Sequence, residues 1–404
     1  MHLRCIQCAE TFDLHERLLA CRGCGDLLEV VIDDAGMKPA ELKHLWLERR
    51  MSNSARDRSG VWRFREFLPD YSEEQVVTLG EGNVPLVRGK KTAEWVGIKN
   101  LLFKHLGWNP TGSFKDLGMT VGMTEAKFVG AKAVGCASTG NTSASMAAYA
   151  ARAGVKAKVY LPAGKLSHNK LAQALDFGAE IIQVEGSFDR ALDTMLASGE
   201  DVYFLNSINP FRLEGQKTVM FELFEQLNWR APDYVVVPGG NLGNSSSFGK
   251  AFEELIAAGL IEKAPRLVVV QAAGASPFSQ MYRSRAKELT PTEHPETVAT
   301  AIRIGNPRSW KKALRAVQKS GGFVMDVTDA EIGEAKAMIG RDGVGCEPAS
   351  AATLAGLRKL TSQGRFDKDA SVVAILTGHA LKDTDFIISQ QQHVEKAALA
   401  EVHP

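Results

Sequence analysis

Residues 134–152 read VGCASTGNTSASMAAYAAR, a strand, a polar turn and a helix in succession, and this stretch decides the fold class. Its first four residues, Val134–Ala137, are small and apolar, as expected of a short buried strand. Residues 143–152 are rich in alanine and predict a helix. A buried strand that leads directly into a helix is the first half of a β–α–β unit, so the sequence predicts parallel strands.

The same alternation recurs along the chain. Helical patterns lie near Glu41–Met51 and at His168–Phe177. Strands are expected at Lys158–Leu161, Ile181–Val184, Tyr203–Leu205, Tyr234–Val237, Leu267–Gln271 and Ser371–Leu376. Strands that alternate with helices predict an α/β fold in which parallel sheets are covered on both faces.

Composition excludes several classes of protein. The chain has 404 residues, 45% of them hydrophobic and 24% charged, which suggests two or three domains. Its 48 basic and 47 acidic residues give a net charge of +1, which argues against a nucleic-acid-binding protein. No run of about 18 apolar residues occurs, and the first residues lack the apolar core of a secretion signal. We therefore expect a cytoplasmic protein with no membrane segment and no nucleic-acid partner.

Four cysteines lie near the start of the chain as two C-x-x-C pairs with twelve residues between them, and these are Cys5, Cys8, Cys21 and Cys24. In a reducing compartment, such pairs indicate a metal site rather than disulfides. Four thiolates suit tetrahedral zinc. The alternative is a small ribbon whose thiols hold no metal. Because the spacer is short, we expect residues 1–35 to form a zinc-ribbon-like segment with a structural role.

A lysine stands at the expected start of a helix. Residues 109–116 read NPTGSFKD, in which Pro110 and Gly112 indicate a turn and Ser113 is placed to cap a helix that begins near Lys115. A helix N-terminus disfavours the charged form of a lysine, and the neutral amine is the form that attacks an aldehyde. Taken alone, the stretch is more typical of a surface lysine on a capped helix.

Two polar turns at strand ends favour the chemical interpretation of this lysine. Residues 138–142 (STGNT) offer hydroxyls, an amide and backbone N–H groups at a helix start, which suits a carboxylate. Residues 238–244 (PGGNLGN) bring a glycine-rich backbone to a helix start, which suits a phosphate. Each turn alone could be an ordinary strand-to-helix connection, and the second lacks the spacing of nucleotide-binding loops. Together with the lysine they indicate pyridoxal 5′-phosphate, which carries an aldehyde and a phosphate.

These segments, in this order, resemble the threonine synthases of the tryptophan-synthase-β-like group of pyridoxal-phosphate enzymes. The resemblance runs from LGEG at 79–82 to LTGH at 376–379, and its most specific matches are NPTGSFKD at 109–116 and NSINPFR at 206–212. The N-terminal cysteine pairs also resemble those at the front of many threonine synthases. Three residues depart from the family pattern: Leu117 replaces an Arg, Val84 a Thr and Ala380 a Gly. None of these changes removes a group that the resemblance assigns to the chemistry.

The resemblance implies a role for each polar residue of these segments. Lys115 would bind the cofactor aldehyde and then act as acid and base, while Asn141 would bond the ring hydroxyl and Thr377 the ring nitrogen. The cofactor phosphate would lie against Gly240, Asn241, Leu242, Gly243 and Asn244. The substrate carboxylate would bind Ser138, Thr139 and Thr142, and the substrate phosphate would bind Asn206, Ser207 and Arg212.

Other residues near these segments have simpler explanations. Glu347 precedes a proline and is expected to cap a helix. His379 is expected to pack beside the site rather than to act as a base. Met119, Met123 and Phe128 follow Lys115 at helical spacing and are expected to form one buried face.

The resemblance also implies the architecture and the reaction. Two open, mostly parallel sheets (fold type II) would hold the cofactor in a cleft between a small domain, residues 116–205, and a large domain, residues 36–115 and 206–404. The enzyme, a homodimer, would convert O-phospho-L-homoserine and water to L-threonine and phosphate by γ-elimination and β-addition of water. The alternatives are a β-replacement enzyme such as a cysteine or cysteate synthase acting on phosphoserine, an amino-acid dehydratase, and a zinc-ribbon binding protein on an inactive scaffold.

Overall fold

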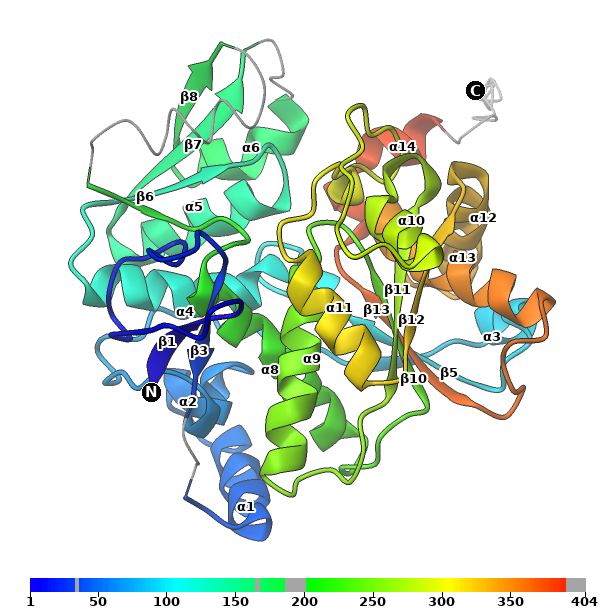
Figure 1. Cartoon of the computed structure of the whole chain (residues 1–404), viewed down its shortest axis with the longest axis horizontal. Helices are drawn as coiled ribbons and strands as arrows, with labels where there is room; N and C mark the ends of the chain where they lie inside the picture. Colours follow the sequence, from blue (N-terminus) through cyan, green and yellow to red (C-terminus); the bar gives the residue numbers. More distant parts are fainter. Residues whose placement is uncertain (33–35, 164–167, 186–200, 390–404) are drawn as a thin grey trace, which may run out of the picture.

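The computed structural model describes residues 1–32, 36–163, 168–185 and 201–389 and arranges their strands in three sheets (Figure 1). A three-stranded sheet lies near the N-terminus, and a six-stranded and a four-stranded sheet form two separate α/β layers. The expectation of an α/β fold with two mostly parallel sheets is confirmed.

The six-stranded sheet has the strand order β12-β11-β10-β13-β5-β4. All its neighbours run parallel except β4, which is antiparallel to β5 at one edge. Its strands are β4 (Leu86–Arg88), β5 (Asn100–His105), β10 (Tyr234–Pro238), β11 (Arg266–Ala272), β12 (Phe323–Val327) and β13 (Ser371–Leu376). Consecutive valines explain why it is buried on both faces: Val235 and Val237 belong to one hydrophobic cluster, and Val236 belongs to another.

Helices cover both faces of this sheet. On the first face, α9 (Gly243–Ala257) and α11 (Trp310–Lys319) contribute Phe248 and Val317 to the cluster that contains Val235. On the second face, α12 (Asp329–Arg341) and α13 (Pro348–Ser362) add Ile332 and Leu354 to the other cluster, and α3 (Lys91–Val96) packs beside them. This arrangement is the doubly wound form that alternating strands and helices predict.

The four-stranded sheet is entirely parallel, with the order β8-β7-β6-β9. Its strands are β6 (Ala133–Ala137), β7 (Lys156–Pro162), β8 (Glu180–Val184) and β9 (Val202–Phe204), and its helices are α4 (Lys115–Phe128), α5 (Asn141–Ala153) and α6 (His168–Asp176). The long helix α8 (Pro210–Gln226) packs against α4 and joins the two layers. Gly215 allows this close approach, because a Cβ there would lie 1.8 Å from the Leu117 carbonyl oxygen.

The N-terminal ribbon consists of β1 (His2–Cys5), β2 (Thr11–Phe12) and β3 (Leu28–Val31). It contacts α11 through an ion pair of 2.6 Å between Glu29 and Arg315. It contacts α4 through His15, whose Nδ1 lies 3.0 Å from the Glu125 carboxylate. The ribbon therefore touches a helix of each layer.

The remaining elements connect these parts. They are α1 (Pro39–Arg50), α2 (Ala55–Arg58), α10 (Pro277–Ser284), α14 (Thr384–Ser389) and the 3-10 helices η1 (Trp62–Phe67), η2 (Leu106–Trp108), η3 (Ala273–Ala275), η4 (Thr300–Ile302) and η5 (Ala380–Lys382). Within the part of the chain that the structure describes, no helix has the length and apolar character needed to cross a membrane.

The predicted elements lie where the sequence placed them, with ends that differ by one or two residues. One strand was predicted to extend to Leu205, but β9 ends at Phe204. The sequence analysis did not identify β4, β5 or β12. The prediction that Phe128 is buried was wrong: Met119 and Met123 are buried, whereas Phe128 is 40% exposed because it lies in the last turn of α4.

Candidate active site

The candidate site forms where strands from both parallel sheets end. Residues 138–142 follow the carboxyl end of β6, and Asn206 lies two positions beyond β9. In the larger sheet, the glycine-rich turn follows β10 and Thr377 follows β13. Open α/β sheets bind ligands at the carboxyl ends of their strands. The predicted residues of both layers are therefore placed at the edges where a ligand is expected.

Lys115 is the first residue of α4 and is partly exposed. Its Nζ lies 3.9 Å from the centroid of the Phe114 ring. Burial and, to a lesser extent, the nearby positive charge of Arg212 lower the pKa of Lys115 to about 7, although the Glu347 carboxylate acts in the opposite direction. Near neutral pH, a large share of this amine is uncharged, as reaction with an aldehyde requires.

The helix that carries Lys115 begins at the predicted residue. Phe114, rather than Ser113, is its N-cap residue and makes no side-chain cap, but the Ser113 hydroxyl accepts a long hydrogen bond (3.4 Å) from the Lys115 backbone N–H. Ser113 is buried, and its backbone forms an isolated β-bridge with Gly378. The turn is thus held by the strand-end segment after β13, which the local sequence pattern could not reveal.

Asp116 fixes the turn of the lysine and was not identified from the sequence. Its fully buried carboxylate accepts hydrogen bonds from the Thr111 backbone N–H (2.7 Å), the Thr111 hydroxyl (2.6 Å) and the Ser145 hydroxyl (2.6 Å). Because Ser145 lies on α5, these bonds connect the start of the lysine helix to the helix that begins with Asn141. Burial raises the pKa of Asp116 to about 6.

The glycine-rich turn forms an anion cradle. Leu242 adopts a left-handed conformation with φ of 64°, which turns the chain into α9. The helix then begins at Gly243 without a side-chain cap, so its first N–H groups remain available to an anion. At Gly240, a Cβ would lie 3.2 Å from Ile302, so a side chain at this position would crowd the turn.

Buried polar atoms around this cradle lack partners. Within the described part of the chain, no hydrogen bond reaches the side-chain oxygens of Asn244 and Ser245, in the first turn of α9, or those of Gln216 and Ser309. Buried polar groups are rarely left unpaired in proteins. The amide oxygens of Asn244 and Gln216 can only accept, but the hydroxyls of Ser245 and Ser309 can donate to an anion. These two hydroxyls and the backbone N–H groups of the turn therefore fit a bound phosphate group.

Asn141 and Thr377, which were predicted to flank the cofactor ring, both bond to Glu347. Asn141 Nδ2 donates to Oε2 of Glu347 (2.9 Å), and the Thr377 hydroxyl donates to Oε1 (3.0 Å). The prediction that Glu347 caps a helix was half right. It is the N-cap residue of α13, but its side chain does not cap and reaches into the site instead. His379 serves as the cap of η5, with Nδ1 accepting from the Leu381 N–H.

The three residues predicted to hold a substrate carboxylate stand at the start of α5. Ser138 and Thr139 lie in the turn after β6, and Thr142 is the second residue of the helix. The Ser138 hydroxyl accepts a hydrogen bond from the Gly140 N–H at 3.3 Å. All three residues are partly exposed, so a small anion can reach this turn.

The residues predicted to hold a substrate phosphate are only partly brought together. Ser207 accepts a hydrogen bond of 2.7 Å from the Asn241 amide, and Asn206 accepts one of 3.2 Å from the Ala137 N–H. Arg212 is 1% exposed, and its Nη1 donates to the Leu205 carbonyl at 2.9 Å. Among the described residues, no hydrogen bond joins Arg212 to the other two side chains. Its Nε atom is buried without a partner.

The four N-terminal cysteines form one cluster. Their Sγ atoms all lie within 4.8 Å of one another, with Cys5 and Cys24 3.4 Å apart and Cys8 and Cys21 3.5 Å apart. A zinc ion with four tetrahedral bonds of about 2.3 Å holds its sulfur ligands roughly 3.8 Å apart. The cluster is therefore compatible with zinc. All six cysteines of the chain are free thiols.

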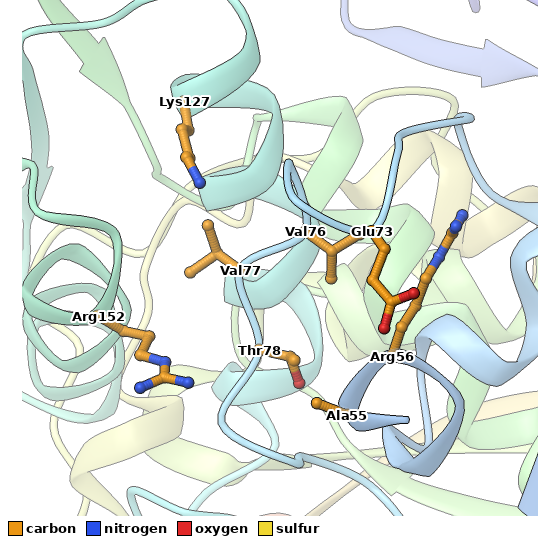
Figure 2. A pocket seen from close by; sticks show the side chains of 8 residues that line it. All are labelled: Ala55, Arg56, Glu73, Val76, Val77, Thr78, Lys127 and Arg152. Carbon is orange, nitrogen blue, oxygen red and sulfur yellow. The ribbon is translucent and has the colours of Figure 1, made fainter. Parts of the chain in front are cut away.

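A separate pocket has a volume of about 230 Å³, and Figure 2 shows the side chains that line it. It opens between α2, the loop before Gly80 and the ends of α4 and α5, and none of the predicted site residues lines it. Its lining residues are Ala55, Arg56, Glu73, Val76, Val77, Thr78, Lys127 and Arg152.

The departures from the family pattern lie in packed surroundings. Leu117 is 2% exposed and belongs to the main hydrophobic cluster, so an apolar side chain suits this position. Val84 is also buried, and its carbonyl accepts hydrogen bonds from Lys104 and Gln226, both at 2.9 Å.

Comparison with protein families places these residues in context. A family model described as "Pyridoxal-phosphate dependent enzyme" matches residues 77–378. The threonine synthase of Methanocaldococcus jannaschii is 50% identical over 388 residues, which cover 95% of this chain and 94% of that protein. The threonine synthase of Methanosarcina acetivorans is 46% identical over 390 residues, which cover 96% and 93%.

Solved structures agree on the fold. The crystal structure of threonine synthase from Escherichia coli aligns with a TM-score of 0.73 at 19% identity and covers 98% of this chain and 93% of that one. The structure of maize serine racemase aligns with a TM-score of 0.63 at 22% identity and covers 76% and 91%. At these identities, the likeness concerns the arrangement of the chain alone.

Proposed function

This chain belongs to the threonine synthases, a branch of the pyridoxal-phosphate-dependent enzyme family, and we propose that it converts O-phospho-L-homoserine and water to L-threonine and phosphate. The reaction removes protons from Cα and Cβ of the substrate, releases phosphate from Cγ, adds water at Cβ and returns protons to Cγ and Cα. Pyridoxal 5′-phosphate, when bound, supplies an aldehyde that captures the substrate amine and a conjugated ring that accepts the charge of a Cα carbanion.

We assign the cofactor to the residues at the strand ends of the larger layer and to α5. Lys115 would hold its aldehyde, Asn141 and Thr377 would contact its ring, and the turn of Gly240, Asn241, Leu242, Gly243 and Asn244 would hold its phosphate. The unpartnered hydroxyls of Ser245 and Ser309 and the uncapped start of α9 support this assignment.

Lys115 is the residue that we propose moves protons. Its lowered pKa leaves Nζ able to accept a proton from Cα near neutral pH and to return one at a later step. Asp116 holds the turn in place through Thr111 and Ser145, so that the amine keeps a fixed position at the start of α4.

The two anionic groups of the substrate, its carboxylate and its phosphate, would lie on either side of the Lys115 amine. Ser138, Thr139 and Thr142 would hold the carboxylate at the start of α5. Asn206, Ser207 and Arg212 would hold the leaving phosphate, for which a guanidinium group is well shaped. The hydrogen bond between Ser207 and Asn241 supports this arrangement, because it connects the substrate-phosphate residues to the turn assigned to the cofactor phosphate.

Identity to threonine synthases over nearly the full chain carries the proposed reaction. A β-replacement enzyme acting on phosphoserine would share the lysine and the glycine-rich turn but would not need the residues at 206–212. These residues follow β9 and extend into α8, and their position after a strand end of the smaller sheet supports their assignment to the site.

The decisive experiment measures both products from O-phospho-L-homoserine. Purified enzyme loaded with pyridoxal 5′-phosphate should release phosphate and threonine in equal amounts, and the Lys115→Ala variant should release neither. Phosphate without threonine, or turnover of phosphoserine with a sulfur nucleophile in place of this reaction, would contradict the proposal. The Glu334→Gln variant, which alters an exposed carboxylate on α12, is the matched control and should retain full activity.

The same proposal includes the domain division and the setting of the enzyme. We place the small domain at residues 116–205, which contain all strands of the four-stranded sheet, and the large domain at 36–115 and 206–404, with the ribbon at 1–35 before it. The six free thiols suit the cytoplasm. Sedimentation equilibrium tests the expected homodimer, which a monomer at micromolar concentration would contradict.

A further inference from the structure

Glu347 stands between the two side chains that are assigned to the cofactor ring. It is 3% exposed, and its two carboxylate oxygens point to different partners: Oε2 accepts from Asn141 (2.9 Å) and Oε1 from Thr377 (3.0 Å). Asn141 begins α5 in the four-stranded layer, whereas Thr377 follows β13 in the six-stranded layer. One carboxylate therefore joins the two layers at the site.

The backbone holds Glu347 in this position. Its N–H donates to the Gly378 carbonyl at 3.0 Å, and the preceding residue, Cys346, pairs with His379 in an isolated β-bridge. A Cβ at Gly378 would lie 2.5 Å from Cδ of Glu347. The carboxylate thus occupies the space that a side chain at residue 378 would need.

The hydrogen bonds around Thr377 determine whether its hydroxyl can donate or accept a further hydrogen bond. The Ser350 hydroxyl oxygen accepts from the Thr377 N–H (2.8 Å) and the Gly378 N–H (3.1 Å), which uses both of its lone pairs. Its proton is then free to donate to the Thr377 hydroxyl oxygen, 3.0 Å away. Thr377 gives its own proton to Glu347. With an ionised Glu347, Thr377 therefore presents to the site one lone pair and no proton.

Burial and the surrounding polar groups act on Glu347 in opposite directions. Burial is the larger influence, and it raises the pKa of this carboxyl above its usual range. The hydrogen bonds from Asn141 and Thr377 and the amines of Lys382 and Lys115 act to lower the pKa. Lys382 is held in place by its own bond to the Thr111 carbonyl, at 3.1 Å.

We propose that Glu347 is a positioning residue, which orients both the Asn141 amide and the Thr377 hydroxyl that are assigned to the cofactor ring. This inference rests on the proposed cofactor site and does not depend on the substrate.

Two substitutions separate the two parts of this role. Glu347→Ala removes both acceptors. Glu347→Gln keeps one oxygen for Asn141 but places an amide donor toward Thr377, so that the threonine proton loses its acceptor and is turned toward the site. Glu334→Gln, on the exposed face of α12, is the matched control.

The apo-enzyme is titrated with pyridoxal 5′-phosphate in the absence of substrate. The visible absorbance of the bound cofactor is the readout. Glu347→Ala should raise the apparent Kd about tenfold, as expected for the loss of hydrogen bonds at a buried site. Glu347→Gln should bind within about threefold of the wild type, as expected where one acceptor is kept, but with a shifted absorbance maximum. Glu334→Gln should match the wild type in both respects.

Wild-type Kd and absorbance in both Glu347 variants would overturn the inference. If Glu347→Ala does not fold, as judged by thermal unfolding of the apo-protein, the nearly isosteric Glu347→Gln variant decides: a shifted absorbance maximum supports the role, and an unchanged one refutes it. A protein that shows these effects but makes no threonine would contradict the proposed reaction and leave the role of Glu347 supported.

Discussion

The side-chain amide of Asn241 donates a hydrogen bond of 2.7 Å to the hydroxyl of Ser207, 34 positions away in the chain. The other end of the same amide accepts from the Arg308 N–H at 2.7 Å. Asn241 lies in the glycine-rich turn, and Ser207 lies in the segment assigned to the substrate phosphate. The bond therefore places two proposed phosphate sites next to each other.

Loss of this bond should weaken binding of the substrate through its phosphate group. Ser207→Ala removes a hydroxyl that bonds the turn, and its loss should cost about 1 kcal/mol, or roughly a fivefold rise in KM for O-phospho-L-homoserine. Steady-state kinetics and inhibition by inorganic phosphate measure the effect. The control is Ser284→Ala, whose hydroxyl bonds only to carbonyls of its own helix. An unchanged KM would show that Ser207 does not contact the phosphate.

Capture of the cofactor should depend on pH near neutrality. Since burial lowers the pKa of Lys115 to about 7, its amine loses its charge as the pH rises through that value. The rate at which the apo-enzyme takes up pyridoxal 5′-phosphate should therefore rise between about pH 6 and pH 8 and then level off. Stopped-flow absorbance measures this rate. Removal of the positive charge in Arg212→Met should move the midpoint to higher pH, and an unchanged midpoint would exclude Arg212 as a cause.

Asp116 should contribute to stability as well as to the site. Asp116→Ala leaves the Thr111 N–H and the Thr111 and Ser145 hydroxyls without their acceptor, and it should lower the free energy of unfolding by about 3 kcal/mol. Urea denaturation of the apo-protein measures the change. Asp70→Ala, at a side chain 96% exposed, should leave the stability nearly unchanged. A loss of similar size in both variants would contradict this account.

The cysteine cluster should hold one zinc ion per chain, which elemental analysis of the purified protein can measure. Removal of the metal should release the ribbon and, with it, the Glu29–Arg315 and His15–Glu125 contacts. We expect the Tm to fall by about 5 °C, equivalent to roughly 1–2 kcal/mol for a domain of this size, and to recover when zinc is returned. A chelated, metal-free protein with an unchanged Tm would show that the ribbon folds without metal.

Gly378 should be intolerant of even one methyl group. In Gly378→Ala, the new Cβ would lie 2.5 Å from Glu347 Cδ, so the carboxylate must move and release Asn141. We expect weaker binding of pyridoxal 5′-phosphate, by about tenfold, as estimated for lost hydrogen bonds. The matched control is Gly340→Ala in α12, where a Cβ meets nothing within 4 Å and should add up to about 1 kcal/mol of stability. Equal cofactor affinity in both variants would contradict the close contact.

The sequence by itself determined the elements and the chemical type of the protein. Valine-rich runs such as Tyr234–Val237 predicted buried parallel strands because their burial on both faces is a local property of composition. The two cysteine pairs predicted the cluster, since the spacing within each pair already brings two thiols together. The segment NPTGSFKD located Lys115, because the turn and the helix start are encoded within eight residues.

Only the tertiary structure decided how these parts meet. Glu347 shows why: its place before Pro348 marked the start of a helix, but its carboxylate bonds to Asn141, 206 positions away, and to Thr377, 30 positions away. Ser113 was expected to cap its own helix, and its hydroxyl does accept one long bond from the Lys115 N–H, but its backbone also pairs with Gly378, far along the chain. Local patterns report conformation and burial, whereas the partner of a buried polar group depends on which strand ends the sheet order brings together. For that reason, the sequence pointed to Lys115 and the glycine-rich turn, and the fold alone brought Glu347 and Asp116 to the residues that they bond.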